Sequence, residues 1–244
     1  MNINLNDNLT DEEIDQLVKT RNELTLKIDS HFKKKKIAKI NNNKKYIGKC
    51  YKDIPTRECK LVMQCYRSGH HSVLEHASFT FKISGISRAC SHQLVRHRMA
   101  SYSQRSQRYC GEDGFGYVTP PSIELSSYHD SIENALDEYV HLKNSMGRPA
   151  EDARYVLPNA CVTAIYVTMN LRSLINFMRE RLCNRAQWEI REAAKEMRKL
   201  VVDVMPQADE MLRPKCEAHV DYPFCPEHKS CGRHLTLKGV YRTE

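Results

Sequence analysis

The chain has 244 residues and a mass of 28.4 kDa, and hydrophobic residues make up 41% of it. This composition predicts a globular protein with its own core and excludes a disordered chain. No apolar run approaches the roughly 20 residues of a membrane-spanning helix. Because the first residues are acidic rather than signal-like, we expect a cytoplasmic protein.

The net charge of +8 comes from one segment. Residues 30–49 hold eight Lys and no acidic residue, so the remainder carries 30 basic and 30 acidic side chains. A solvated Lys-rich stretch is the simpler interpretation, and binding of a polyanion is the alternative.

The sequence pattern of the N-terminal part predicts two helices. Residues 10–33 form a charged pattern with Thr10 as N-cap and acidic residues in the first turn. Residues 37–55 resemble a linker. A second helix over about residues 57–68 has an apolar face and stops near Gly69.

Two strands and several helices are expected further along the chain. The alternation of Phe79, Phe81 and Ile83 with polar residues predicts a strand, and residues 161–168 predict another. Helices are expected from about residue 87 and over residues 130–145, 170–179 and 186–203, with Gly147 and Asn170 as boundary signals. Few strands and no βαβ alternation predict an α+β fold, in which helices flank an antiparallel sheet core. We expect a single domain over residues 50–212, between an N-terminal extension (1–49) and a C-terminal tail (213–244).

Residues 96–109 read RHRMASYSQRSQRY and hold four Arg and one His without a carboxylate. Guanidinium groups bind phosphate bidentately, and the neighbouring hydroxyls and amides suit ribose and base edges. Because the block is expected to occupy the end of a helix and the loop after it, backbone donors can join them there. The block predicts a nucleotide site; a solvated basic loop is the alternative.

Ten cysteines in an apparently intracellular chain predict reduced thiols. Cys90 and Cys161 lie in apolar segments and are expected to pack in the core. The tail differs, because three Cys alternate there with three His: Cys216, Cys225, Cys231, His219, His228 and His234. Their spacing matches no standard zinc pattern, so a zinc site and a Cys-rich surface tail both remain open.

Several further blocks accompany RHR in a fixed order. They are HHSVLEH (70–76), FTF (79–81), SRA (87–89), HQLV (92–95), ARYVLP (153–158), NLRSLINF (170–177) and AQWEI (186–190). Together with RHR, seven intervening residues and Ser106, the region of about residues 65–210 resembles the flavin-dependent thymidylate synthases.

The resemblance implies an activity and an assembly. The enzyme would convert dUMP to dTMP with methylenetetrahydrofolate as carbon donor, FAD as hydride carrier and NADPH as reductant. It would be a homotetramer whose sites combine several subunits. No cysteine would attack the pyrimidine, and no metal ion would be needed.

Site residues follow from the same resemblance. Those implied to bind FAD are Ser72, Arg96, His97, Arg98, Gln104, Asn170, Leu171, Arg172 and Asn176. Those implied to bind dUMP are Gln93, Arg96, Gln104, Arg105, Ser106, Gln107, Arg108, Arg154 and Arg181. Ser106 could also be a nucleophile, but the sequence offers no adjacent base, so a phosphate ligand fits better.

Arg181 and His70 are the candidate catalytic residues. Arg181 could stabilise negative charge on the uracil ring, and a solvated ion pair is its alternative; His70 would lie near the flavin, or be an ordinary hydrogen-bonded histidine. On a continuous helix Arg181 points about 180° away from Arg172. Either the helix breaks near Arg181, or its faces serve different sites.

Two departures from the family pattern stand out. Gln104 occupies a position where many relatives carry Glu, and residues 1–49 lack the usual N-terminal strand and helix. The competing functions are a nucleic-acid-binding protein that uses the Arg- and Lys-rich segments, and a flavoprotein of this fold with another substrate.

Overall fold

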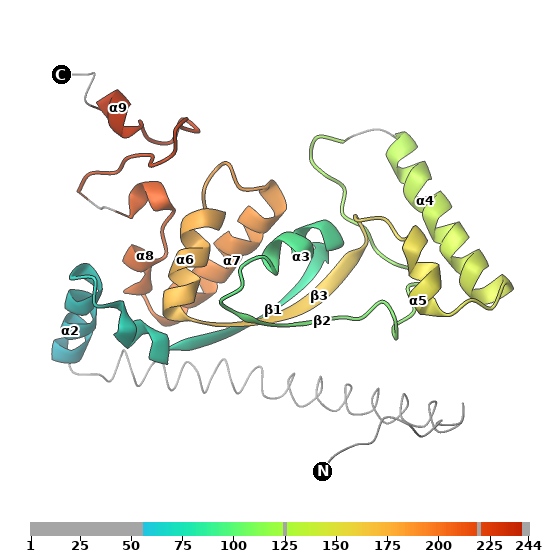
Figure 1. Ribbon diagram of the computed structural model, residues 1–244, viewed down its shortest axis with the longest axis horizontal. Coiled ribbons are helices and arrows are strands. Elements are labelled where there is room, and N and C mark those ends of the chain that lie inside the picture. The colour runs from blue at the N-terminus through green and yellow to red at the C-terminus, as the bar shows by residue number, and fades with distance from the viewer. Residues whose placement is uncertain (1–55, 124–125, 219–220, 241–244) are drawn as a thin grey trace, which may run out of the picture. The chain divides into compact units, whose positions relative to one another are not determined.

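A computed structural model describes residues 56–123, 126–218 and 221–240 (Figure 1). Residue contacts group the chain into two units, Met1–Cys59 and Lys60–Glu244, and the second is described below. The expected helix over 10–33, the linker, the Lys-rich segment and the boundary at residue 49 lie outside the described residues. The expected boundary after residue 212 stays a prediction.

A three-stranded antiparallel sheet forms the centre, in the order β1-β3-β2. Strands β1 (Ser78–Ser87) and β3 (Val162–Asn170) pair along their whole length, which confirms the two expected strands and the antiparallel α+β fold. The third strand, β2 (Ser101–Gln104), lies where the sequence predicted a loop. That prediction was wrong because the short, polar segment SYSQ has no strand pattern of its own and gains its ladder from β3.

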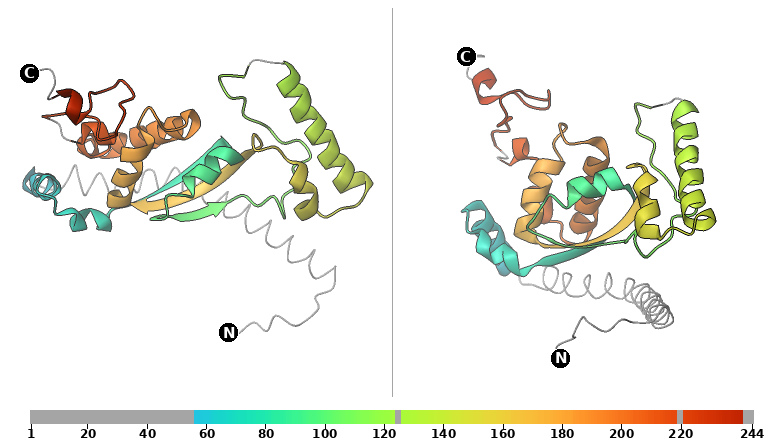
Figure 2. Two further views of the ribbon diagram at one scale, coloured as in Figure 1. Left: turned by 45° about the horizontal axis from the view of Figure 1, so that its top comes forward. Right: turned by 45° about the vertical axis from the view of Figure 1, so that its right-hand side comes forward.

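The core lies between the sheet and three helices on one of its faces. Helices α3 (Arg88–Leu94), α6 (Leu171–Arg181) and α7 (Trp188–Val204) gather there (Figures 1 and 2). Alternate residues of β3 point toward them and are buried. Fully buried aliphatic residues, among them Ile165, Leu174 and Ile190, each contribute roughly 1.5–3 kcal/mol through burial.

Side-chain caps begin these helices where the sequence expected them. Asn170 accepts a hydrogen bond from the Ser173 N–H at 2.8 Å and starts α6, while Ser87 does the same for the Cys90 N–H at 3.0 Å and starts α3. The buried Glu189 of α7 accepts two bonds of 2.6 Å from Ser87, one from N–H and one from Oγ. This carboxylate therefore ties α7 to the junction of β1 and α3.

A second, smaller core lies beside α4 (Ser126–Val140). Phe115, Ile132 and Cys161 form it, and short helices follow along the chain: α5 (Ala150–Ala153) and η3 (Arg154–Val156). The helix expected over 130–145 begins earlier and ends in a π-helical turn, η2 (His141–Ser145). The expected stop is confirmed, because Gly147 has a φ of +62° that favours glycine.

The remaining elements are short. Helix α2 (Thr56–Arg67) ends before Gly69, as expected, and η1 (His71–His76) leads into β1. The C-terminal part contains α8 (Ala208–Met211), η4 (Lys215–Glu217) and α9 (Leu237–Val240). Among the described residues, no helix is both long and apolar enough to cross a membrane.

Candidate functional site

The RHR triplet forms the turn between α3 and β2. Arg96 and Arg98 are exposed, and His97 between them is half-buried. In the part of the chain that the structure describes, neither arginine has an ion-pair partner. Two exposed guanidinium groups two residues apart form a cationic turn that suits an anionic ligand.

His97 is held against α6 by a hydrogen bond of 2.7 Å between its Nε2 and Ser173 Oγ. The Ser173 hydroxyl donates its proton to the Met99 carbonyl at 2.5 Å, so Nε2 of His97 must be the donor. The ring also meets Phe177 edge-on, with centroids 5.4 Å apart. Burial lowers the pKa of His97, and the nearby charge of Arg181 lowers it further. His97 is therefore a neutral, oriented donor.

Arg181 lies at the last position of α6 and points toward α3. Its Nη2 donates to the Gln93 carbonyl at 3.3 Å, and the side chain is half-buried rather than solvated. On the same helix Arg172 and Asn176 are exposed, and Arg172 forms an ion pair with Glu75 of η1. Because α6 is continuous to Arg181, the helix does not break, and its different faces carry these residues.

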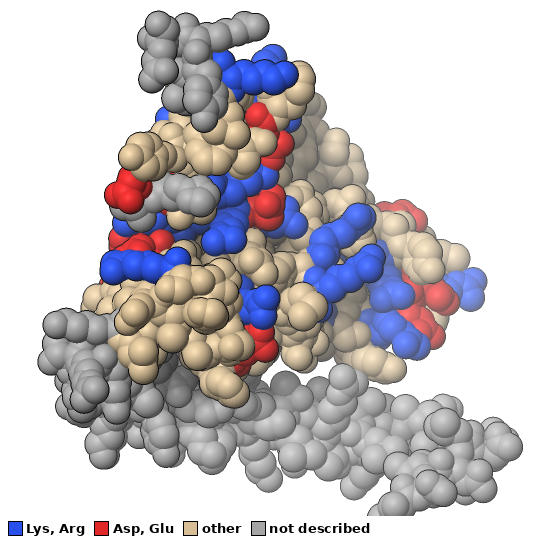
Figure 3. Space-filling model, turned by 60° about the vertical axis from the view of Figure 1, so that its left-hand side comes forward, with Lys and Arg blue, Asp and Glu red and all other residues tan. Residues whose placement is uncertain are grey.

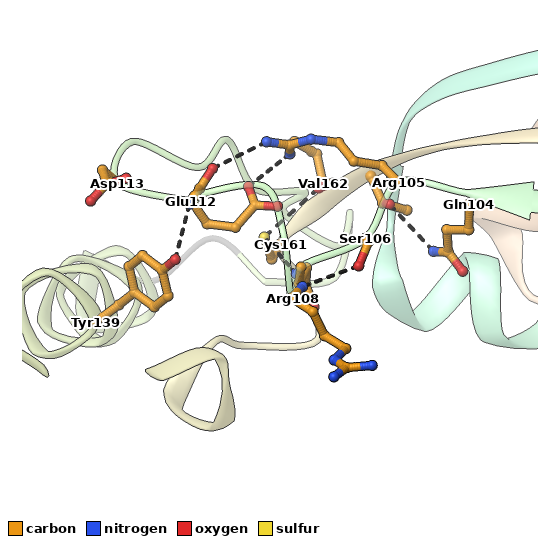
Figure 4. Close-up of polar contacts among 12 residues, drawn as sticks. Gln104, Arg105, Ser106, Arg108, Glu112, Asp113, Tyr139, Cys161 and Val162 are labelled. Carbon is orange, nitrogen blue, oxygen red and sulfur yellow. Dashed lines mark hydrogen bonds and ion pairs between the residues drawn. The ribbon is translucent and has the colours of Figure 1, made fainter. Parts of the chain in front are cut away.

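The second half of the arginine block follows β2 and is held by a buried carboxylate (Figure 4). Arg105 Nη1 lies 2.8 Å from Glu112 Oε2, and the Glu112 side chain is only 3% exposed. The N–H of Glu112 donates to the Tyr139 hydroxyl at 3.1 Å. No sequence signal pointed to Glu112, which lies beyond the block and outside any periodic pattern.

Arg108 is paired at the surface. Its Nη2 lies 2.6 Å from Glu151 Oε2, and both side chains are nearly half exposed. Arg154 Nε donates to the Glu151 carbonyl at 3.0 Å, which brings two of the expected dUMP ligands to one short helix. The Ser106 hydroxyl accepts a bond of 3.2 Å from the Arg108 N–H, which is the bond of a serine turn.

Other expected site residues differ in how accessible they are. Ser72 and His70 are exposed at η1, whereas the amide of Gln104 donates inward to Ser91 Oγ at 2.8 Å. Gln107 is buried and donates to the Cys161 sulfur at 3.6 Å. Leu171 is fully buried and its N–H donates to the Ala77 carbonyl at 2.7 Å, so neither its side chain nor its N–H is available to a ligand.

These residues form two groups within one chain. Arg172 and Asn176 lie beyond the Asn170 end of β3, whereas Arg105 bonds through its N–H to the Ala164 carbonyl near the other end. Six residues of strand separate these two points, which corresponds to about 20 Å. A single small ligand cannot contact both groups in one chain.

Two cysteines that the sequence placed in the core are poor nucleophiles. Cys90 and Cys161 are 1% and 0% exposed. Burial raises the pKa of Cys90 to about 12 and that of Cys161 to about 11, so both remain protonated thiols near neutral pH.

A pocket of about 640 Å³ opens between α2, α6 and the C-terminal part. Its lining combines three arginines and a histidine with two carboxylates and two tyrosines: Arg67, Arg179, Arg213, His71, Glu210, Asp221, Tyr66 and Tyr222. Arg179 follows Arg172 and Asn176 on α6 at seven and three residues, so the three lie on one side of the helix. The pocket is therefore next to the exposed face of α6.

Known proteins are similar to this chain over most of its length. A family model described as thymidylate synthase complementing protein matches residues 11–207. A flavin-dependent thymidylate synthase from Geobacter sulfurreducens is 50% identical over 182 residues, which cover 71% of this chain and 76% of the relative. The chain belongs to the flavin-dependent thymidylate synthases.

Two further members of this family are similar over comparable lengths. The enzyme of Clostridium tetani is 43% identical over 194 residues (71% of this chain, 76% of the relative). That of Saccharolobus solfataricus is 42% identical over 211 residues (84% and 79%). The family match begins at residue 11 and so includes most of the N-terminal segment whose pattern departs from the expected one.

Proposed function

We infer that this protein converts dUMP to dTMP, with FAD as cofactor and with methylenetetrahydrofolate and NADPH as co-substrates. Its membership of the flavin-dependent thymidylate synthases carries this conclusion. FAD supplies hydride transfer between the reductant and the pyrimidine. The protein then has to bind, orient and polarise the reactants.

We propose that the RHR turn and the exposed face of α6 hold FAD. The chemistry of the donors supports this: Arg96 and Arg98 offer cations for a pyrophosphate, and His97 provides a neutral, fixed ring between them. The expected ligands Ser72, Gln104, Asn170, Arg172 and Asn176 belong to the same proposal, whereas the buried Leu171 is left out of it. Among them, Asn170 keeps its side-chain nitrogen for a ligand while its oxygen caps α6.

We propose that Arg181 with Gln93 and Arg96 contacts the uracil ring, and that the phosphate binds to the turn after β2. The proximity of Arg181 to Gln93 supports the first part. The phosphate ligands would be Arg105, Ser106, Gln107, Arg108 and Arg154. His70 is proposed to contact the flavin, since its side chain is exposed.

The separation of the two groups within one chain supports a shared site. If Arg108 of one subunit completes the site at Arg172 and Asn176 of another, the enzyme must be an oligomer, and we propose the homotetramer expected from the resemblance. Light scattering should then give the mass of four chains. A monomer that turns over dUMP would refute the shared site.

We also propose that the pocket beside α6 holds the anionic end of NADPH or of methylenetetrahydrofolate. Arg179, which has no ion-pair partner among the described residues, supports an anion, and the two tyrosines suit a ring system. Arg179→Ala should raise the KM for one co-substrate and leave that for dUMP unchanged. An equal effect on all three would contradict this placement. Because the co-substrates belong to intracellular metabolism, we propose a cytoplasmic enzyme.

The experiment that tests the function combines a spectrum with an assay. The purified protein should show a flavin spectrum, and it should form dTMP only when dUMP, methylenetetrahydrofolate and NADPH are all present. A flavin-loaded protein without dTMP formation would favour the flavoprotein with another substrate. A flavin-free protein that binds RNA would favour the nucleic-acid alternative, although Figure 3 shows Lys and Arg interspersed with Asp and Glu on the face that it draws.

A further inference from the structure

Within the C-terminal part, residues 225–236 form a loop that is hydrogen-bonded to the end of α6. Cys225 pairs with Thr236 in an isolated bridge, and its N–H donates to the Leu235 carbonyl at 2.7 Å. Arg233 Nη1 donates to the Leu182 carbonyl at 3.3 Å, and Arg185 Nη1 donates to the Lys229 carbonyl at 3.2 Å. The loop therefore has a defined position against residues 182–185.

Inside this arrangement a thiol, a carboxylate and an imidazole converge. Ligand atoms of Cys216, Glu217 and His234 lie within 4.8 Å of one another, with Cys216 buried and the other two half-buried. Tetrahedral zinc, with bonds of about 2.3 Å to sulfur and 2.0 Å to nitrogen, keeps its ligands about 3.5 Å apart. The pair His234 Nε2 and Glu217 Oε1 is already at 3.5 Å. Shortening the other separations by about 1.3 Å or less would bring the rest to this spacing.

Two further buried thiols belong to the segments that meet here. Cys183, which follows Arg181 by two residues, is next to Leu182, whose carbonyl accepts the bond from Arg233. Cys225 is also buried, and its backbone pairs beside His234. All of these thiols are reduced. A site with two soft sulfur ligands and an imidazole suits Zn²⁺ better than Mg²⁺ or Ca²⁺.

An ion pair accounts for only part of this cluster. Glu217 lies 3.5 Å from Arg233 Nε and 3.5 Å from His234, so a metal is not required to explain the carboxylate. The ion pair leaves the buried Cys216 thiol beside the carboxylate unexplained. The Glu217 carboxylate lies within 4.8 Å of this thiol, so a negative neighbour is present where a cation would be favourable.

We propose that Cys216 and His234 bind a zinc ion, with Cys183 and Glu217 available to complete the four ligands. The ion joins the C-terminal part to the end of α6 and is structural, because zinc with four protein ligands has no open position. Of the two alternatives that the sequence left open for the tail, a zinc site and a Cys-rich surface tail, this proposal favours the zinc site. If the proposed function holds, the ion also fixes the helix end that carries Arg181.

Metal analysis of the full chain, purified with a reductant, tests this site without reference to activity. We expect about one zinc per unaltered chain. Cys216→Ser and His234→Ala each remove a ligand, so both variants should lose zinc. The matched controls are Cys65→Ser and His228→Ala, which lie outside the cluster and should keep the zinc. Circular dichroism confirms that each variant is folded.

A second measurement uses the unaltered chain in case Cys216→Ser does not fold. After removal of zinc, added Co²⁺ should give the intense near-ultraviolet absorption of thiolate-bound cobalt, and added zinc should abolish it. A reduced protein that holds neither ion overturns the proposal. A disulfide between Cys183 and Cys216, or equal zinc loss in the two control variants, also overturns it.

Discussion

The two halves of the arginine block differ in how their charge is balanced. Among the described residues, Arg96 and Arg98 have no carboxylate partner, whereas Arg105 and Arg108 are paired with Glu112 and Glu151. A ligand anion can therefore supply the missing counter-charge of the first half. In the second half a phosphate must share or displace a carboxylate that is already present.

The two ion pairs of the second half also differ from each other. The Arg108–Glu151 pair is exposed and screened by solvent, so a phosphate can replace the carboxylate at little cost. The Glu112 side chain is buried, and Arg105 together with the Tyr139 hydroxyl holds its segment. Arg105 is thus fixed in place, and Arg108 is the more adaptable phosphate ligand.

The largest effect is expected in the first half. Arg96→Ala or Arg98→Ala removes a charged hydrogen-bond donor worth about 1.5–3 kcal/mol, so FAD should bind roughly 10- to 150-fold more weakly. Flavin absorbance after gel filtration measures the occupancy. Lys199→Ala, an exposed cation on α7, is the control for lost charge and should keep its flavin. Full occupancy in both arginine variants would exclude the RHR turn from the FAD site.

The next largest effect is on stability, and it distinguishes the buried carboxylate of Glu112 from the exposed carboxylate of Glu151. Glu112→Gln keeps the shape but removes the buried charge that Arg105 pairs with, and should cost on the order of 2 kcal/mol of unfolding free energy. For a chain of this size this corresponds to a decrease in Tm of about 4–8 °C. Glu151→Gln is the matched control at the exposed pair and should change Tm much less. Equal decreases would show that burial of Glu112 does not distinguish the two pairs.

A smaller effect is expected on substrate binding in the second half. Arg108→Ala should raise the KM for dUMP about tenfold through the loss of one charged phosphate contact, with FAD still bound. Steady-state kinetics on flavin-loaded protein measures it. Glu151→Gln frees the same guanidinium and should leave the KM unchanged or lower it. A normal KM in Arg108→Ala would place the phosphate elsewhere.

The smallest effect concerns His97. Because burial and Arg181 lower its pKa in the folded state, the unfolded chain takes up this proton at a higher pH than the folded chain does. Stability should therefore fall as the pH decreases below about 6.5, the usual value for histidine, until it passes the lowered pKa. Denaturant unfolding between pH 5 and 8 measures this slope. His97→Gln should give a shallower slope, and an unchanged slope would assign the effect to other groups.

Much of this fold was readable from local sequence signals. Periodicity and caps predicted β1, β3 and the main helices, because alternation and a side chain such as Asn170 act within a few residues. Strand β2 was missed, since four polar residues form a strand only when β3 lies beside them. The angle between Arg172 and Arg181 was also predictable, but the choice between a broken helix and two helix faces was not; the structure shows that α6 runs unbroken to Arg181, its last residue.

The sequence by itself determined the family, the arginine block and the set of residues that can meet a flavin and a nucleotide. Only the tertiary structure decided how these residues are divided: which arginines have carboxylate partners, which face of α6 each residue uses, and that Cys216 and His234 converge at the end of that helix. The reason is distance along the chain. Glu151 lies 43 residues from Arg108 and Ser173 lies 76 residues from His97, so no local pattern encodes these contacts, and only packing of the sheet and helices creates them.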